Sequence, residues 1–226
     1  AQTNRITTAP YYTVEIGAPG AEYALVTGIF TNLTLSGEAN GMWEMSADVI
    51  GKAVTTKAMT TGLDVRDVDL IRMADTHIYV TPWARSTISA TALDATLISF
   101  ELTANPQRHM KTFAGSSNPA AYGDSTWEGQ LTTVLEFNSN AKTLVNEMLS
   151  PDTLVQRQIR IKAATGATTK ARQATIDFAG TLADTVTLWD DRDGNMTVSL
   201  VWNGTYNKAS TSWLKLDVKN ELSTIV

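Results

Sequence analysis

Hydrophobic and polar residues alternate along most of this chain, which predicts strands with one buried face. Met196, Val198, Leu200 and Trp202 are a clear case. Turn residues separate the segments with this pattern. We expect strands at 12–16, 24–27, 29–35, 43–49, 68–73, 76–81, 92–103, 127–137, 158–162, 173–179, 185–189, 195–204 and 213–218. The pattern therefore predicts a mainly β fold.

A helical period occurs at one place, Ser139–Leu149. The apolar residues there fall at i, i+3, i+4, i+7 and i+8 and form one stripe: Ala141, Leu144, Val145, Met148 and Leu149. Asn138 or Ser139 supplies an N-cap, and Pro151 stops the helix. We therefore expect one amphipathic helix on the β fold.

Two polar stretches lack either period. Residues 52–67 are rich in Thr, and residues 104–125 hold Pro106 and Pro119 among several glycines. We expect both stretches to be long loops. Loops of this length inside a compact domain are usually functional.

Two segments resemble each other without a gap. Glu22–Gly51 aligns with Thr175–Gly204, and five identities fall in this register: Thr34, Leu35, Gly41, Ser46 and Gly51 meet Thr187, Leu188, Gly194, Ser199 and Gly204. The alignment favours a duplication, although two Thr-rich hairpins can also resemble each other by chance. The helix precedes only the second copy, so we expect the first copy to lack its front half and the chain from Ala1 to be a fragment.

Composition narrows the function classes. The chain has 226 residues, 43% hydrophobic and 18% charged, which is typical of a globular protein. The net charge of −5 argues against an electrostatic grip on nucleic acid, but it suits a surface past which a polyanion slides. The absence of Cys excludes disulfides and thiolate chemistry. No apolar run is long enough to span a bilayer, and no signal peptide is visible.

Residues that could carry catalysis are sparse. The two histidines are His77, in a strand pattern, and His109, in a polar loop, and no Gly-x-Ser-x-Gly motif is present. The acidic run 190–193 before Gly194 has no closing Glu, so we interpret it as a charged hairpin turn instead of a calcium loop. Asp69, with its acidic neighbours, suggests a solvated edge. We therefore expect no enzyme, no cofactor and no metal site.

The order of elements resembles the tail tube (major tail) proteins of long-tailed bacteriophages. The resemblance rests on the strand 127–137, the helix 139–149, the strands and hairpin over 158–204, and the strand 92–103 with its long loop. It covers roughly 77–206 well and roughly 11–60 as a partial second domain. The resemblance implies a tail-tube-like β-sandwich or barrel with one flanking α-helix, duplicated with the first copy partial.

The resemblance also implies a domain order. It predicts an N-terminal arm at 1–10, a partial first domain at 11–76, a complete second domain at 77–210, and a C-terminal strand and tail at 211–226. In this family, subunits join their sheets into a ring whose inner wall is a closed β-barrel, and the rings stack into a tube.

Partners and location follow from the same resemblance. It implies self-association into trimeric (pseudo-hexameric) or hexameric rings and stacked tubes, and contacts with the tape measure protein and other tail proteins. Genomic DNA passes through the lumen without specific binding, and no membrane anchor is expected. The protein belongs in the virion, in the phage tail, after assembly in the host bacterial cytoplasm.

The two polar loops are the expected contact sites. The loop 104–125 resembles the inter-ring loop of the family, and 52–67 either bridges the two domains or reaches a neighbour. The candidate contact residues are Lys52, Lys57, Asp64, Arg66, Asp67, Gln107, Arg108, His109, Lys111, Phe113, Tyr122 and Asp124.

Two alternatives stay open. The first is a carbohydrate-binding β-sandwich of a phage receptor-binding or decoration protein, because exposed Trp and Tyr rings can stack on sugars. Trp43, Trp127 and Trp202 fit core or interface positions equally well. The second alternative is another ring-forming tail component, such as a distal tail or terminator protein.

Overall fold

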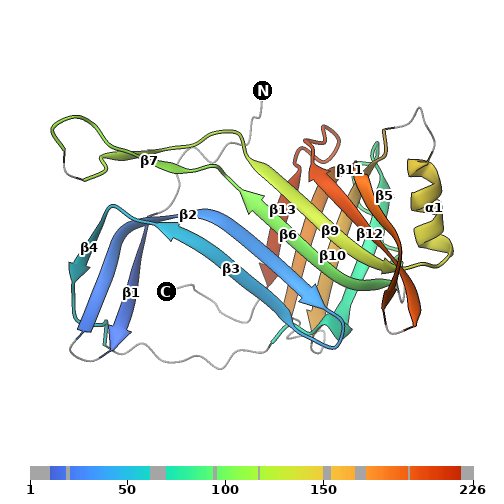
Figure 1. Cartoon of the computed structure of the whole chain (residues 1–226), viewed down its shortest axis with the longest axis horizontal. Coiled ribbons are helices and arrows are strands. Elements are labelled where there is room, and N and C mark those ends of the chain that lie inside the picture. The colour runs from blue at the N-terminus through green and yellow to red at the C-terminus, as the bar shows by residue number, and fades with distance from the viewer. Residues whose placement is uncertain are drawn as a thin grey trace. The chain divides into compact units, whose positions relative to one another are not determined.

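The computed structural model describes residues 11–18, 21–61, 70–93, 96–116, 118–149, 154–165, 172–192 and 194–219. These residues form a mainly β protein with one α-helix (Figure 1). The elements are β1 (Tyr12–Ala18), β2 (Ala21–Glu38), β3 (Trp43–Ile50), β4 (Ala53–Thr56), a 3₁₀ turn (Met73–Asp75), β5 (Thr76–Pro82), β6 (Leu97–Asn105), β7 (His109–Lys111), β8 (Ala121–Gly123), β9 (Glu128–Glu136), α1 (Ser139–Met148), β10 (Gln156–Thr165), β11 (Arg172–Arg192), β12 (Asn195–Gly204) and β13 (Leu214–Lys219).

The described residues divide into two compact units that interleave along the chain. The first unit holds the residues up to Thr34, those in Ser46–Asp69 and those in Ala104–Glu128. The second unit holds Leu35–Met45, Leu70–Thr103 and the residues from Gly129 onward. This division differs from the consecutive domains 11–76 and 77–210 that we expected, because β2 and β3 each run from one unit into the other.

An antiparallel sheet forms the second unit. Its strands are hydrogen-bonded in the order β6-β9-β12-β11-β10-β5. Two strands share one edge of β11: β12 pairs with Gly180–Arg192, and β13 pairs with Gln173–Phe178. Residues 205–213 connect β12 to β13. The two strands therefore pair with successive parts of the same edge of β11, and a loop separates them.

The core of the second unit lies between the inward faces of these strands. Ile159 and Ile161 of β10 and Phe178 of β11 are almost fully buried, as are Leu200 and Trp202 of β12. Burying each such side chain contributes about 1.5–3 kcal/mol relative to leaving it exposed. The alternation in the sequence predicted which side of each strand faces this core.

The expected helix is confirmed as α1, which lies beside the strands of the second unit (Figure 1). The side-chain oxygen of Asn138 accepts hydrogen bonds from the backbone N–H groups of Asn140 and Ala141, at 2.9 and 3.2 Å. Ala141, Leu144 and Val145 are buried in the core. These three residues attach the helix to the sheet, as the spacing predicted. Leu149, which we also expected in the apolar stripe, lies at the C-cap and is exposed.

In the first unit, β2 is the central strand. It pairs with β1 on one side, and both β3 and β4 also pair with it. The short strands β7 and β8 form a separate hairpin. Many strand residues of the first unit are exposed or half-buried, whereas the strands of the second unit enclose a buried core.

The two expected loops contain strands. β4 lies inside 52–67 and pairs with β2, because the β-branched run Val54–Thr56 suits a strand although it does not alternate in polarity. β7 and β8 lie inside 104–125, where three-residue strands are too short to produce a period in the sequence. Both loop predictions were wrong at these residues.

Other strand predictions differ from the structure in their extent. The segments 24–27 and 29–35 form one strand, β2, with a positive φ of 55° at Thr27, and 173–179 and 185–189 likewise form one strand, β11. The strand expected from 92 begins at Leu97. Met73 opens the 3₁₀ turn instead of ending a strand.

Candidate functional site

The candidate contact residues lie in the first unit wherever they are described. Asp64, Arg66 and Asp67 lie outside the described residues. The other nine fall on two segments, the one that contains β4 and the one that contains β7 and β8: Lys52, Lys57, Gln107, Arg108, His109, Lys111, Phe113, Tyr122 and Asp124.

A buried ion pair joins the residue before β7 to the residue after β8, at the open end of this hairpin. Arg108 Nε lies 3.3 Å from Asp124 Oδ1, and each side chain is 8% exposed. Arg108 Nη1 also donates to the Phe30 carbonyl, at 3.3 Å, and the guanidinium lies 5.4 Å from the centre of the Trp127 ring. This burial leaves little of Arg108 or Asp124 for a neighbouring subunit, so the pair holds the hairpin in place.

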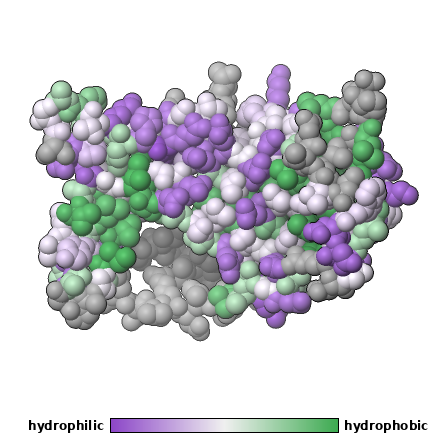
Figure 2. Space-filling model, viewed as in Figure 1, coloured by the Kyte–Doolittle hydropathy of each residue, from purple (hydrophilic) through white to green (hydrophobic). Residues whose placement is uncertain are grey.

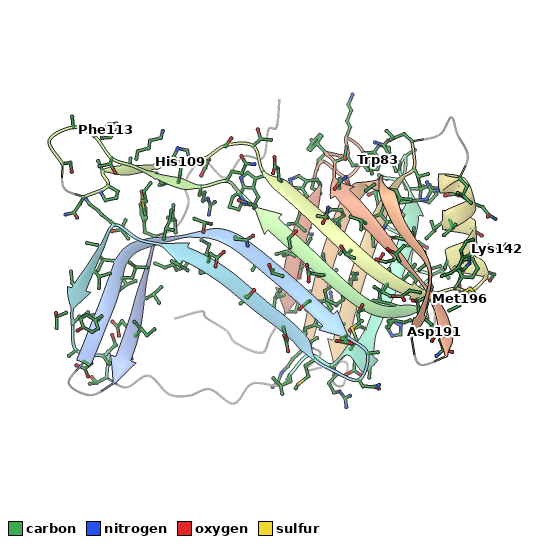
Figure 3. The ribbon with its side chains drawn as sticks, viewed as in Figure 1. Trp83, His109, Phe113, Lys142, Asp191 and Met196 are labelled. Atoms are coloured by element: carbon green, nitrogen blue, oxygen red, sulfur yellow. The ribbon has the colours of Figure 1, made fainter. Side chains whose placement is uncertain are left out.

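Beyond the ion pair, the hairpin exposes one large apolar side chain, Phe113. Phe113 is exposed past the end of β7, and His109 is exposed at its start (Figure 3). His109 faces Gly123 across the hairpin, where an added Cβ would lie 2.6 Å from the imidazole. Tyr122 packs edge-on against Tyr11, with ring centres 5.7 Å apart. Phe113 is therefore the contact candidate that the geometry leaves most available.

Lys57 is held by the first strand. The carboxylate of Glu15 in β1 accepts hydrogen bonds from the Lys57 ammonium group and from the backbone N–H and hydroxyl of Thr60. These bonds, led by the one from Lys57, lower the pKa of Glu15 to about 2. Lys52 is exposed, and its backbone N–H donates to the Val26 carbonyl at 3.0 Å. Of the two lysines, Lys52 has the less constrained side chain.

One face of the β1-β2-β4 sheet is apolar and exposed. The strand register places Val14, Leu25 and Val54 in one row across β1, β2 and β4, and it places Ile16 beside Tyr23. All of them except Leu25 are exposed, and Figure 2 shows hydrophobic atoms gathered over β1 and β4. Contiguous exposed apolar side chains of this kind are typical of interaction sites.

The outward surface of the second unit has two parts with different charge. Over β2, β6 and β9 lies an open hollow of about 610 Å³. The charged residues that line it are Glu38, Glu44 and Glu101, and the rest of its lining mixes polar residues such as Ser99 and Thr132 with the apolar Met42, Phe100 and Val134. We call this surface the acidic face.

Elsewhere on the outward surface, β10 and β13 carry Arg and Lys residues. Arg160 and Lys162 of β10 and Lys215 of β13 point outward, opposite the buried positions. Asp177 of β11 forms an ion pair with Arg160. We call this surface the basic face.

The strand β13 leaves one edge of the second unit open. It pairs with β11, and no described strand pairs with its other edge. Leu216 and Val218 point to the core side, but they sit at the border of the sheet, and Val218 is 70% exposed. An unpaired strand edge can serve as a template for pairing with another chain.

No group of three or more His, Asp or Glu residues in the described part of the chain could hold a metal ion. The acidic hairpin turn is explained by its own hydrogen bonds, because Asp191 Oδ1 accepts from the Gly194 N–H at 2.9 Å. His77 is exposed on β5. Within the same described residues, no helix has the length and apolar character to cross a membrane.

The sequence did not single out the side chains that shape the basic face. Gln158, Arg160 and Asp177 appear as ordinary polar positions of alternating strands, and Asn207 appears as a loop residue. Strand register and burial are needed to see that they come together. In comparisons with known proteins, no family model and no curated protein matches this sequence.

Proposed function

We propose that this chain is a structural protein that polymerises as stacked rings to form a phage tail tube, the conduit for DNA ejection. The observation that carries the proposal is the open edge of β13, where the apolar residues Leu216 and Val218 are exposed. A second copy that adds its own strand there would satisfy the unpaired backbone groups and cover Leu216 and Val218. The mainly β architecture with one helix is consistent with such a protein.

The acidic face supports the role of a conduit. The charged residues that line it are all glutamates, and none of its lining residues is positively charged. A wall of this kind repels phosphate groups, so DNA passes along it without specific binding. In the proposed ring this surface faces the lumen.

The rest of the assembly follows from the same proposal. Three copies make a pseudo-hexameric ring if the chain carries two tube domains, and six copies make a ring if it carries one. The tape measure protein and other tail proteins are the expected partners, and the phage tail is the expected location. The exposed Phe113 and the apolar face of β1, β2 and β4 are the surfaces that we assign to contacts between subunits.

Electron microscopy of the purified protein tests the proposal. We expect rings or tubes for the natural sequence and monodisperse small particles for Val218→Asp, because a carboxylate at this edge opposes strand addition. Leu154→Asp is the matched control, since Leu154 is equally exposed but lies on no strand. Small particles from the natural sequence under all conditions would count against the proposal.

Within the same class, another ring-forming tail component is the nearest alternative. It predicts single rings that do not stack into tubes. The micrographs separate the two directly.

A carbohydrate-binding role has one observation in its favour. Among the six Trp residues, all of which are described, Trp189 is the exposed one, and its ring lies 6.5 Å from that of Phe137. Trp202 is buried in the core and Trp43 packs on Phe100. Glycan binding that is lost in Trp189→Ala would support this alternative, and normal assembly of the same variant would support the tube.

A further inference from the structure

Two Asn-Gly pairs occur in this chain, and the fold places them in different settings. Asn40 and Gly41 lie in the turn between β2 and β3 (Figure 1), whereas Asn203 and Gly204 lie at the end of β12. An Asn that precedes Gly is prone to lose its side-chain amide, because Gly has no Cβ to keep its backbone nitrogen away from the Asn Cγ. The two pairs share this chemistry, so the structure decides which of them reacts.

The first pair is exposed in a tight turn. Among the four residues of this turn, Glu38 to Gly41, Asn40 alone has a positive φ, 65°, which is the pattern of a type II turn. The Gly41 N–H donates to the Glu38 carbonyl at 2.8 Å. The Asn40 side chain is exposed, and its amide forms no hydrogen bond with another described residue. One backbone bond is therefore the main restraint on the Gly41 nitrogen.

That bond can open without disturbing the strands. A rotation of the peptide between Asn40 and Gly41 moves the Gly41 nitrogen away from the Glu38 carbonyl, and glycine tolerates the φ values that it passes through. The bonds that flank the turn use other atoms, since the Ala39 N–H donates to the Ile98 carbonyl and the Gly41 carbonyl accepts from Met73. Local opening of this kind needs far less free energy than unfolding of a strand.

The second pair is held on both sides. Asn203 pairs with Thr181 of β11 and with Gln130 of β9, and Gln130 Nε2 donates to Asn203 Oδ1 at 3.2 Å. Gly204 lies against Trp213, where an added Cβ would be 2.7 Å from the ring. The same peptide rotation here requires strand separation and a shift of the Trp213 ring. The fold therefore opposes reaction at Asn203.

We propose that Asn40 is a site of spontaneous deamidation and that the fold protects Asn203 from it. The Gly41 backbone nitrogen attacks Asn40 Cγ, the bond from Cγ to Nδ2 breaks, and the proton of the Gly41 nitrogen leaves with that amino group as ammonia. Water then opens the resulting five-membered succinimide and gives aspartate or isoaspartate. Water is the one co-reactant, and no oxidation or reduction occurs.

Conversion changes the acidic face. Asn40 lines the hollow of about 610 Å³ together with Glu38, Glu44 and Glu101. Each conversion adds a carboxylate there, on a chain whose net charge is already −5. The negative charge of this face thus increases with the age of the protein. The inference does not rest on the proposed tube, because both Asn-Gly pairs belong to the second unit of one chain.

Peptide mass spectrometry of the full chain, aged at neutral pH, tests the proposal. We expect Asn40 to convert at least about tenfold faster than Asn203, which corresponds to a difference of about 1.4 kcal/mol in the free energy of opening. In denaturant the two residues should convert at similar rates, because the strand pairing of Asn203 is lost. The denatured chain is therefore the matched control for the chemistry of the two pairs.

Two variants locate the reaction. Gly41→Ala should slow conversion at Asn40 and leave Asn203 unchanged, because the added Cβ hinders ring closure. Asn40→Gly fits the positive φ and removes the amide, so the acidic charge variant that anion exchange resolves in the aged protein should disappear. Thermal unfolding of both variants checks that the fold is intact.

Two results would overturn the proposal. One is equal conversion of Asn40 and Asn203 in the folded chain, which would mean that the strand setting gives no protection. The other is an Asn40 that converts in denaturant but stays intact in the folded chain, which would mean that the turn bond to Glu38 is sufficient to block the reaction.

Discussion

Two long hairpins, β2–β3 and β11–β12, begin and end at corresponding residues, but their side chains are buried to different extents. In the alignment of Glu22–Gly51 with Thr175–Gly204, the turns and strand ends correspond within two residues. Yet Met45 is 71% exposed where its counterpart Val198 is fully buried, and Tyr23 is exposed where Ile176 is buried. The duplication itself stays a prediction.

The difference arises from neighbouring elements and not from the hairpins. β11 and β12 are flanked by β10, β13 and β9, and their inward side chains meet the core to which α1 also contributes. The β1 and β4 strands beside β2 are short, and the apolar face that they share is exposed. The same local pattern thus specifies a hairpin in both places, while burial depends on what packs against it.

Core truncation should give the largest effect. Phe178→Ala removes a buried ring from β11 and should lower the free energy of unfolding by about 3–5 kcal/mol. Met45→Ser in the other hairpin should change it by less than about 0.5 kcal/mol, because Met45 is exposed. Denaturant unfolding measures both values. A loss of several kcal/mol in Met45→Ser would show that the two hairpins are equally packed.

The buried ion pair of the first unit should rank next. Arg108→Met leaves the Asp124 carboxylate without its main partner, which should cost about 3 kcal/mol. The double variant Arg108→Met, Asp124→Leu should recover part of this loss. Limited proteolysis of the β7–β8 hairpin measures the loss and the recovery of stability in the first unit. Equal resistance in all three proteins would mean that the pair does not hold the hairpin.

A smaller effect is expected at the helix that precedes only the second hairpin. Asn138→Ala removes the N-cap and should lower the free energy of unfolding by about 1 kcal/mol. Asn146→Ala, on the exposed side of α1, serves as the control. If both substitutions have the same effect, the cap does not contribute to the stability of the second unit.

Acid should affect the first unit through Glu15. The folded-state pKa of about 2 lies below the ordinary value of 4.5, so the stabilisation is complete above pH 4.5 and is lost as the pH falls to about 2. Glu15→Gln should therefore flatten the dependence of proteolytic resistance on pH in this window. An unchanged slope would contradict the assignment. The effect is small because Glu15 and Lys57 lie near solvent.

Much of the fold could be predicted because strands and helices have their own periods. The helix with its Asn138 cap and the strands of the core follow from residues whose spacing is set locally. β4, β7 and β8 were missed because short strands have no measurable period and depend on pairing with distant residues. The candidate contact residues that the sequence suggested lie in the first unit, but the sequence did not predict that Arg108 and Asp124 are buried.

The sequence by itself determined the mainly β class, the helix, the inward face of each core strand, and the lack of thiol chemistry, since alternation and composition act residue by residue. Only the tertiary structure decided which of two similar hairpins is buried, that β13 leaves an open edge, and that Gln158 of β10 and Asn207 of the β12–β13 loop both donate to the Trp83 carbonyl. The physical reason is that burial and hydrogen bonding across long sequence separations depend on strand order and register, which alternation alone does not encode.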